Sequence, residues 1–418
     1  MNIRKFGAIS GGEVDCTAAI QEAIRAAGSC QGEVYIPSGT YLTGALFLES
    51  NMSMYLETGA VLLGITSEEA YPIVSGRVAG IEMDWPAAIL NIREAENVRV
   101  YGNGVIDGQG EYWWKKYWGE NRHEGMRKQY EEQGLRWAVD YDCFRTRNVV
   151  VLNSRQIQLE DFTSKRSGFW NIHLCYSENI EVKRIKINDN NGPSTDGIDI
   201  DSCRTVLVEE CEISCNDDNI CMKSGRDADG LRVNRVCEDI VVQKCKLFEG
   251  EGITIGSETS GGIRNVTIRD NVFSGTSNGF RLKSAKTRGG SVRDIVVRNL
   301  KMENVLRPFD FQYNWHPMYS YCRIPDGYEG IVPDYWNILT QEVPEKQGIP
   351  LAKNISIKNV EATVTNALND VEAFIIKGLK EAPFEKFVFE NIKIEAMSYG
   401  IIENVKDLKF INVTVTIL

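Results

Sequence analysis

The stretch RTVLVEECEIS, residues 204–214, decides the fold because its pattern recurs along the chain. A turn precedes a short run of alternating apolar residues, and a polar break separates this run from a second one. ENIEVKRIKIND at residues 178–189 and EDIVVQKCKLF at residues 238–248 have the same pattern. Alternation with a period of 2 and many β-branched residues is typical of β-strands.

Further copies extend the pattern over most of the chain. They begin at Glu96, Arg147, Arg264, Arg293, Lys353, Glu385 and Lys406. Most spacings are about 21 to 34 residues, in the range that indicates a solenoid. One coil cannot bury its apolar face alone, so neighbouring coils stack into a continuous core. The sequence therefore predicts one all-β solenoid domain over residues 1–418.

Two regions depart from the repeat. DCTAAIQEAIRAAG, from Asp15, has a capping-type start and helical apolar spacing, so we expect residues 1–30 to cap the open end of the solenoid. The C-terminal end carries no comparable cap signal. An aromatic-rich insertion over residues 305–352 should project as a loop near the cleft.

The composition excludes several classes of function. The chain is 43% hydrophobic and 25% charged, which is typical of a folded protein, and no apolar run is long enough to span a bilayer. Its net charge of −11 argues against binding to nucleic acid or to a membrane surface. The N-terminus shows no signal-peptide pattern, so we expect a cytoplasmic protein. A secreted or periplasmic protein whose signal peptide had been removed would have the same kind of N-terminal sequence.

Six of the 11 cysteines lie between Cys203 and Cys245. They could form a metal site or disulfides, but the stretch has no CxxC pair and the chain has only three histidines. We favour small buried thiols in stacked turns and a reducing compartment.

Three segments place charges where a neutral turn would cost less: STDGIDIDSC at 194–203, CNDDNICMKSG at 215–225 and GFRLKSAKTRGG at 279–290. Asp196 and Asp217 are 21 residues apart, about one coil, so they and Asp218 should lie close together on one face. Arg281 and Lys283, two positions apart, should point the same way further along this face.

Clustered carboxylates raise the pKa of at least one member, which yields a protonated acid beside ionised partners. Glycoside hydrolysis needs such an acid and a base that activates water. Solvated turns or a calcium site are the alternatives for a lone Asp-Asp pair.

These segments resemble the polygalacturonase-type pectinases of glycoside hydrolase family 28 along nearly the whole chain. KFGAISGGEVDCTAAIQEAI is similar to the N-terminal segment of that family, and STDGIDIDSC to its Asn-Thr-Asp motif with Ser194 for Asn. CNDDNICMKSG resembles its Gly-Asp-Asp motif with Asn216 for Gly, and FRLKS its Arg-Ile-Lys motif. The resemblance implies a right-handed, single-stranded parallel β-helix of the pectin-lyase-like type.

The resemblance also implies an inverting mechanism on pectin fragments. Asp217 would be the general acid, Asp196 and Asp218 would activate the water, and Arg281 and Lys283 would bind a galacturonate carboxylate. Inverting sites usually hold acid and base roughly 6.5 to 9.5 Å apart. No metal or cofactor is implied; the partner is an acidic oligosaccharide or polysaccharide, and the oligomeric state stays open.

One motif departs from the family. Its usual Gly-His-Gly reads GEG here, with Glu251 at the histidine position. Glu251 would raise the pKa of Asp217, or else bind a sugar hydroxyl or an arginine, unless it only faces solvent. The change suggests a variant subsite, such as one for the rhamnose-containing linkages of rhamnogalacturonan.

Aromatic residues bear on the mode of attack. Trp113, Trp114, Trp118 and Trp137 lie in one non-repetitive segment, and FDFQYNWHPMYSY supplies Phe309, Tyr313, Trp315 and His316. They suit stacking on sugar rings, with Trp315 as a candidate substrate contact, or packing of the two insertions on each other. If the insertions close one end of the cleft, the enzyme would be exo-acting. His173 is either a substrate contact or a supporting residue.

We therefore expect an exo-acting galacturonidase. An endo-acting rhamnogalacturonan hydrolase is the first alternative. A calcium-dependent pectate lyase would need a calcium site and an arginine base. A non-catalytic carbohydrate-binding β-helix would not require carboxylates clustered beside Arg281 and Lys283.

Overall fold

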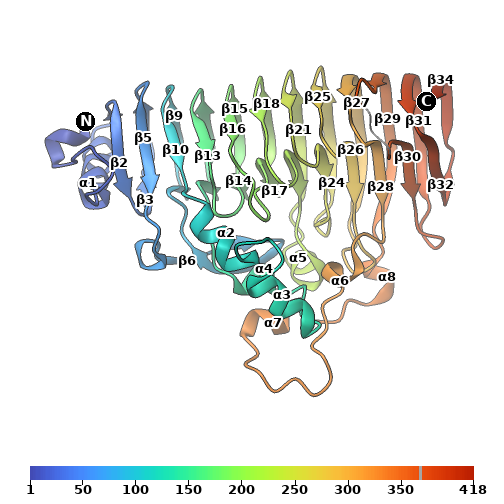
Figure 1. Ribbon diagram of the computed structural model, residues 1–418, viewed down its shortest axis with the longest axis horizontal. Coiled ribbons are helices and arrows are strands. Elements are labelled where there is room, and N and C mark those ends of the chain that lie inside the picture. The colour runs from blue at the N-terminus through green and yellow to red at the C-terminus, as the bar shows by residue number, and fades with distance from the viewer. Residues whose placement is uncertain (367–369) are drawn as a thin grey trace.

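The chain forms a right-handed parallel β-helix, seen in a computed structural model that describes residues 1–366 and 370–418. Coils stack along the long axis from the N-terminal to the C-terminal end, and the insertions project from one side (Figure 1). The predicted all-β solenoid is confirmed. No helix within the described residues is long and apolar enough to cross a membrane.

Among the described residues, an 11-stranded parallel sheet carries the charged segments. Its strands are β3 (Leu46–Leu48), β8 (Leu90–Arg93), β11 (Val149–Leu152), β14 (Ile172–Cys175), β17 (Ile198–Asp201), β20 (Ile220–Lys223), β23 (Ile253–Ile255), β26 (Asn278–Lys283), β28 (Arg307–Gln312), β30 (Glu372–Lys377) and β32 (Ser398–Glu403).

The remaining coil strands form the other faces of the solenoid. They are β1 (Glu33–Ile36), β2 (Gly39–Thr43), β4 (Met52–Leu56), β5 (Ala60–Gly64), β9 (Glu96–Tyr101), β10 (Val105–Asp107), β12 (Arg155–Glu160), β13 (Thr163–Lys165), β15 (Glu178–Lys183), β16 (Lys186–Asn188), β18 (Arg204–Glu209), β19 (Glu212–Ile213), β21 (Cys237–Gln243), β22 (Lys246–Leu247), β24 (Ile263–Arg269), β25 (Val272–Ser274), β27 (Ser291–Glu303), β29 (Leu351–Thr363), β31 (Phe384–Ala396), β33 (Val405–Lys406) and β34 (Lys409–Ile417).

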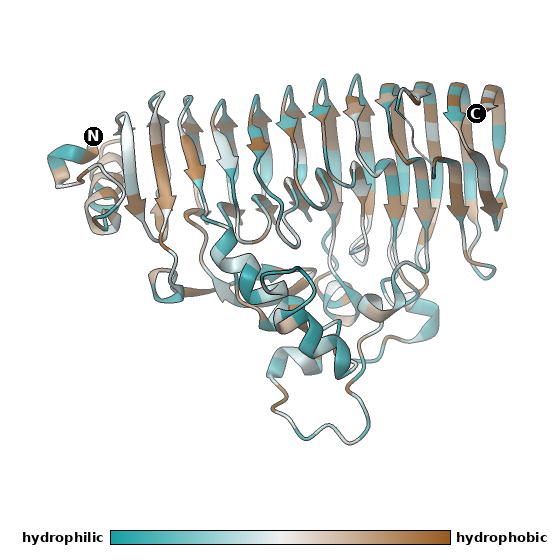
Figure 2. Ribbon diagram, in the orientation of Figure 1, coloured by the Kyte–Doolittle hydropathy of each residue, from teal (hydrophilic) through white to brown (hydrophobic). Residues whose placement is uncertain are grey.

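Stacked aliphatic side chains form the interior of the solenoid. Ile172, Ile198, Ile220 and Ile253 occupy one register position on successive strands, and each is fully buried. Burying such a side chain stabilises the fold by roughly 1.5–3 kcal/mol. Figure 2 shows hydrophobic residues recurring along the coil strands, whereas the projecting helices are largely hydrophilic. Since strand side chains alternate, the neighbouring positions point outward to the cleft.

The Asn and Asp residues that open the repeats have a structural role. Asp239 and Asn265 adopt left-handed backbone conformations with φ of 60° and 55°, which Asn and Asp tolerate better than other non-glycine residues. Asn265 Nδ2 donates to Asp239 Oδ1 at 3.1 Å, so the side chains at this turn also join neighbouring coils.

The N-terminal cap is the predicted helix, α1 (Thr17–Gly28). Ile20, Ala23, Ile24 and Ala27 face the first coil and are fully buried. At the other end, β32 and β34 are largely exposed.

Three insertions leave the coils on the cleft side. The first is an antiparallel hairpin of β6 (Ile73–Val78) and β7 (Ile81–Pro86). The second holds α2 (Glu111–Trp118), α3 (Gly125–Glu132) and α4 (Val139–Asp142). The third holds α6 (Pro317–Ser320), α7 (Asp334–Leu339) and α8 (Glu345–Gly348), and it begins after β28 because residues 307–312 continue the sheet. A short helix, α5 (Asp227–Val233), follows β20 on the same side (Figure 1).

Candidate active site

The three predicted catalytic aspartates lie just before two adjacent strands. Ile198 of β17 pairs with Ile220 of β20, a step of 22 residues, so Asp196 stacks on Asp218 rather than on Asp217. The spacing of 21 residues in the sequence therefore misplaces the partner by one position. Each of the three carboxylates still has an oxygen within 4.8 Å of the other two.

Asp218 is the ionised member of this group. Its carboxylate accepts a hydrogen bond from Lys283 Nζ at 2.8 Å and another from Thr254 Oγ1 at 2.6 Å. Burial alone would raise the pKa of Asp218, but Lys283, Lys223 and Arg281 hold this pKa at about 2. The group therefore carries a full negative charge at neutral pH.

The pKa values of Asp217 and Asp196 are raised instead of lowered. Burial, together with the charge of Asp218, raises the pKa of Asp217 to about 6. Burial and the neighbouring Asp199 and Asp217 raise the pKa of Asp196 well above its usual range. The arrangement therefore keeps a transferable proton beside an ionised carboxylate, as general acid–base chemistry requires.

The carboxylates are closer than the separation usual for inverting glycosidases. One oxygen of each carboxylate lies within 4.8 Å of the others, whereas most inverting sites hold the two carboxyl groups roughly 6.5–9.5 Å apart. Since each hydrogen bond to water spans about 2.7 Å, one water can bridge two oxygens at the shorter distance.

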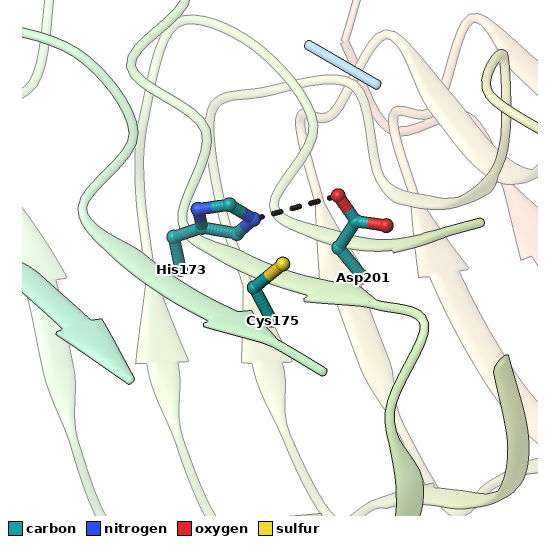
Figure 3. Close-up of side chains that lie close together, drawn as sticks. All are labelled: His173, Cys175 and Asp201. Carbon is teal, nitrogen blue, oxygen red and sulfur yellow. Dashed lines mark ion pairs between the residues drawn. The ribbon is translucent and has the colours of Figure 1, made fainter. Parts of the chain in front are cut away.

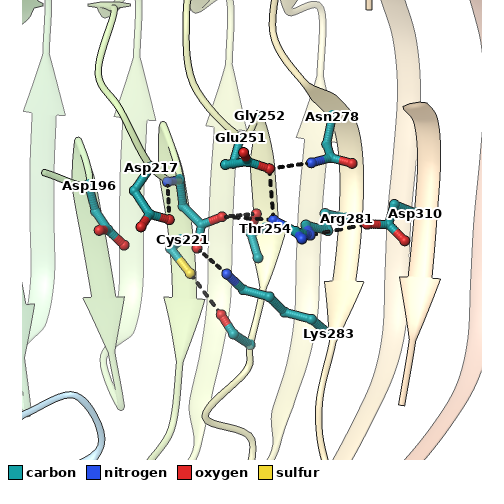
Figure 4. A network of polar contacts seen from close by, with 12 residues as sticks. Asp196, Asp217, Cys221, Glu251, Gly252, Thr254, Asn278, Arg281, Lys283 and Asp310 are labelled. Carbon is teal, nitrogen blue, oxygen red and sulfur yellow. Dashed lines mark hydrogen bonds and ion pairs between the residues drawn. The ribbon is translucent and has the colours of Figure 1, made fainter. Parts of the chain in front are cut away.

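Glu251 is engaged by two neighbours (Figure 4). Arg281 Nη1 lies 2.9 Å from its carboxylate, and Asn278 Nδ2 donates to it at 2.5 Å. Arg281 also contacts Asp310 at 3.2 Å. Glu251 nevertheless contributes to the raised pKa of Asp217. Of the outcomes considered for Glu251, the structure shows both the arginine pair and the effect on the acid.

Trp315 stands over the two predicted substrate-binding cations. Lys283 Nζ lies 4.5 Å from the centre of its ring, and the Arg281 guanidinium lies 5.7 Å from it. Lys283 and Trp315 line the pocket that contains the three aspartates.

Sequence reasoning missed further charges next to the aspartates, of which Lys223 and Glu258 line the same pocket. Lys223 Nζ lies 3.3 Å from Glu258, 3.5 Å from Asp199 and 3.8 Å from Asp196. It also lies 5.0 Å from the centre of the Trp170 ring. A strand-period count would have found Asp199 and Lys223, because they alternate with the buried isoleucine and methionine residues of β17 and β20.

His173 does not line the pocket, so its position agrees with a supporting residue and contradicts the alternative of a substrate contact. Only 1% of the residue is exposed, and its ring packs edge-on against Trp170. Arg147 Nη1 donates to Nδ1 at 2.7 Å, so the proton sits on Nε2, which faces Asp201 at 3.6 Å (Figure 3). Burial lowers the pKa of His173 to about 4, so it is neutral and supports Trp170 from behind.

Cys175 completes a trio with His173 and Asp201 whose ligand atoms lie within 4.8 Å of one another (Figure 3). A metal does not fit the chemistry of this site. Arg77 binds Asp201 at 2.9 Å, and burial raises the pKa of the Cys175 thiol, which keeps it protonated. All 11 cysteines are free, so the six between Cys203 and Cys245 are buried thiols, as favoured.

The insertions contribute residues to the walls of the pocket. Ala79 comes from the hairpin, Arg136 and Asp140 from the helical insertion, and His316 and Tyr319 from the third insertion. The last two insertions pack on each other, since the rings of Trp137 and Trp336 lie 5.1 Å apart.

Most of the candidate stacking aromatics are structural. Trp113, Trp114 and Trp137 are buried, as are Phe309 and Tyr313, whereas Trp315 and His316 line the pocket. The buried aromatic residues therefore pack within the protein. Trp315 and His316 are the ones that a ligand in the pocket could contact.

Arg226 connects the second and third insertions to the coil that carries Asp217 and Asp218. It lies in the loop after β20, beyond Ser224 and Gly225, and is fully buried. Its guanidinium donates to the Tyr141 hydroxyl at 2.7 Å and to the Tyr319 carbonyl at 2.6 Å. One side chain therefore fixes the two walls of the pocket relative to Asp217 and Asp218.

Comparison with known proteins places this site in a family. The model for glycosyl hydrolases family 28 matches residues 32–327, and a rhamnogalacturonase A/epimerase, pectate lyase-like model matches residues 1–55. A probable polygalacturonase of Vitis vinifera is 31% identical over 314 residues, covering 72% of this chain and 60% of that protein. The chain thus spans less than two thirds of the length of this relative.

Two further relatives are similar over the whole chain. An exo-poly-alpha-D-galacturonosidase of Dickeya chrysanthemi is 26% identical over 456 residues, covering 99% of this chain and 70% of that protein. The crystal structure of a hyperthermoactive exopolygalacturonase from Thermotoga maritima matches with a TM-score of 0.82 at 28% identity, covering 100% of this chain and 91% of that one. With the family model matching residues 32–327, the chain belongs to glycosyl hydrolases family 28, whose members hydrolyse O-glycosyl bonds.

Proposed function

We propose that this protein is an exo-acting galacturonidase that removes terminal galacturonate from pectin fragments by an inverting mechanism. The observation that carries the proposal is the pocket lined by the three aspartates, whose walls also include residues from three insertions. A pocket bordered by such insertions admits a chain end more readily than the middle of a polymer. Two relatives with exo-polygalacturonase names, similar over the whole chain, support this mode of attack.

The electrostatics support a division of roles among the aspartates. Asp217, with a pKa of about 6, would protonate the oxygen of the departing sugar. Asp218, held ionised by Lys283, would be the base that takes a proton from water. Asp196 would position that water together with Asp218. We assign inversion from membership of glycosyl hydrolases family 28.

Lys283 and Arg281 would bind the carboxylate of the galacturonate next to the cleaved bond. Both lie under Trp315, which would cover one face of this sugar. Neither cation is free of protein partners, since Lys283 pairs with Asp218 and Arg281 pairs with Glu251 and Asp310. The substrate carboxylate would therefore join an existing network of charges.

The rhamnogalacturonan alternative rested on Glu251. Arg281 and Asn278 already donate hydrogen bonds to this carboxylate. It therefore has fewer free acceptor positions for the hydroxyls of a neutral sugar than an unpaired glutamate would have. The family match that mentions rhamnogalacturonase covers residues 1–55, which contain none of the proposed site residues.

Product analysis tests the proposal. The enzyme should release monogalacturonate from polygalacturonate from the earliest times, with little loss of viscosity, as ion-exchange chromatography and viscometry would show. Early mixtures of oligogalacturonates with a rapid fall in viscosity would refute the exo mode. No hydrolysis of any galacturonate polymer, with cleavage of rhamnogalacturonan, would refute the substrate.

A further inference from the structure

Arg136 brings a cation into the active-site pocket from outside the β-helix. It lies between α3 and α4 in the helical insertion and lines the pocket together with the three aspartates. Its neighbours Leu135 and Trp137 belong to a buried cluster that includes Phe169 and Trp170 on the coil before Asp196. Arg136 thus reaches the pocket from the helical insertion, whereas Arg281 and Lys283 lie on β26 of the β-helix.

Neighbouring residues hold the Arg136 guanidinium in place, but they do not use all of its hydrogen-bond donors. Nη1 donates to Asp140 at 2.7 Å, Nε lies 3.5 Å from Glu131, and the group stands 5.6 Å from the centre of the Tyr319 ring. Among the residues that the structure describes, Nη2 forms no hydrogen bond. Only 14% of the side chain is exposed, so a ligand in the pocket would meet a fixed donor.

The other pocket cations are committed to the catalytic carboxylates. Lys283 pairs with Asp218, and Lys223 lies among Asp196, Asp199 and Glu258. A galacturonate residue carries its own carboxylate on C6. If Arg281 and Lys283 bind the carboxylate on one side of the cleaved bond, the carboxylate on the other side needs a separate cation. Burying it unpaired beside three aspartates would be costly.

We propose that Arg136 binds the carboxylate of the glycone, the terminal galacturonate whose anomeric bond is cleaved. Arginine suits this role because its planar group can hold Asp140 through one nitrogen and present another to a second carboxylate. Arg136 then sets the specificity of the pocket, where it selects an acidic over a neutral terminal sugar. This inference rests on the proposed function, since it assumes that galacturonate occupies the pocket.

Aryl glycosides isolate the glycone, because they have no second sugar for Arg281 and Lys283 to bind. We would measure kcat/KM for p-nitrophenyl α-D-galacturonide and p-nitrophenyl α-D-galactoside. In Arg136→Gln, kcat/KM for the galacturonide should fall about 10- to 100-fold, the usual effect of losing a hydrogen bond to a charged group. The galacturonide-to-galactoside ratio should fall with it, and Arg136→Lys should restore part of the loss.

Arg127→Gln is the matched control. Arg127 lies on α3, pairs with Glu131 as Arg136 does, and is not part of the pocket. It should leave both rates unchanged. An unchanged galacturonide-to-galactoside ratio in Arg136→Gln, whether the rates are preserved or fall together, would overturn the inference but leave the proposed function standing. A wild-type enzyme inactive on every galacturonide would instead refute the proposed function.

Discussion

Neutralising Glu251 should shift the pH dependence of hydrolysis. Asp217 must be protonated to act as the acid, and its pKa of about 6 predicts that kcat/KM falls as pH rises. The protonated fraction drops from about 0.9 at pH 5 to about 0.1 at pH 7, so kcat/KM should drop about tenfold over this interval. Glu251 is one of the charges that raise this pKa. In Glu251→Gln the fall should therefore begin at lower pH.

Two effects of this substitution act in the same direction. It removes a negative charge near Asp217, and it leaves Asp310 as the remaining close carboxylate partner of the Arg281 guanidinium, so more positive charge is felt at the site. Both favour the ionised form of Asp217. Initial rates on trigalacturonate at constant ionic strength would give the profile. Glu249→Gln, the same change at an exposed position of this loop, is the control. A flat profile between pH 5 and pH 8, or a shift of the Glu251→Gln profile to higher pH, would refute the reasoning.

Three further outcomes are expected. Asp217→Asn should lower kcat by about 100- to 10,000-fold with little change in melting temperature, and retained activity would exclude Asp217 as the acid. Arg226→Ala removes the hydrogen bonds to Tyr141 and Tyr319, so the loosened walls should admit longer chains and chromatography should show oligogalacturonates beside the monomer; a monomer-only profile would contradict this role of Arg226. EDTA should leave hydrolysis unchanged, whereas its abolition, with loss of unsaturated products detected by ultraviolet absorbance, would indicate a calcium-dependent lyase.

The fold was predictable because its repeat is local. Alternating apolar residues and turn-forming Asn and Asp at coil intervals predict stacked strands, and the structure shows this pattern in the buried column from Ile172 to Ile253. The convergence of Asp196 with the other two aspartates followed from the same spacing. The exact partner did not, because turn lengths vary by single residues and the step at this site is 22 residues.

Other parts of the site lacked a local signal. The packing of Trp137 on Trp336 and the position of Arg136 depend on contacts between insertions far apart in the chain. Lys223 and Asp199 were within reach of a strand-period argument, since they occupy outward positions on β20 and β17. Their partner Glu258 was not, because it follows a strand in a loop whose course no periodicity describes.

The stereochemistry and identity of the first product test the central claim most directly. Proton NMR during hydrolysis of hexagalacturonate would report both, because each new reducing end appears first in one anomeric form. Exo-acting inversion at the three aspartates predicts that the β-anomer of monogalacturonate appears first and the α-anomer follows by mutarotation. An initial α-anomer, or new reducing ends on oligogalacturonates, would contradict the account.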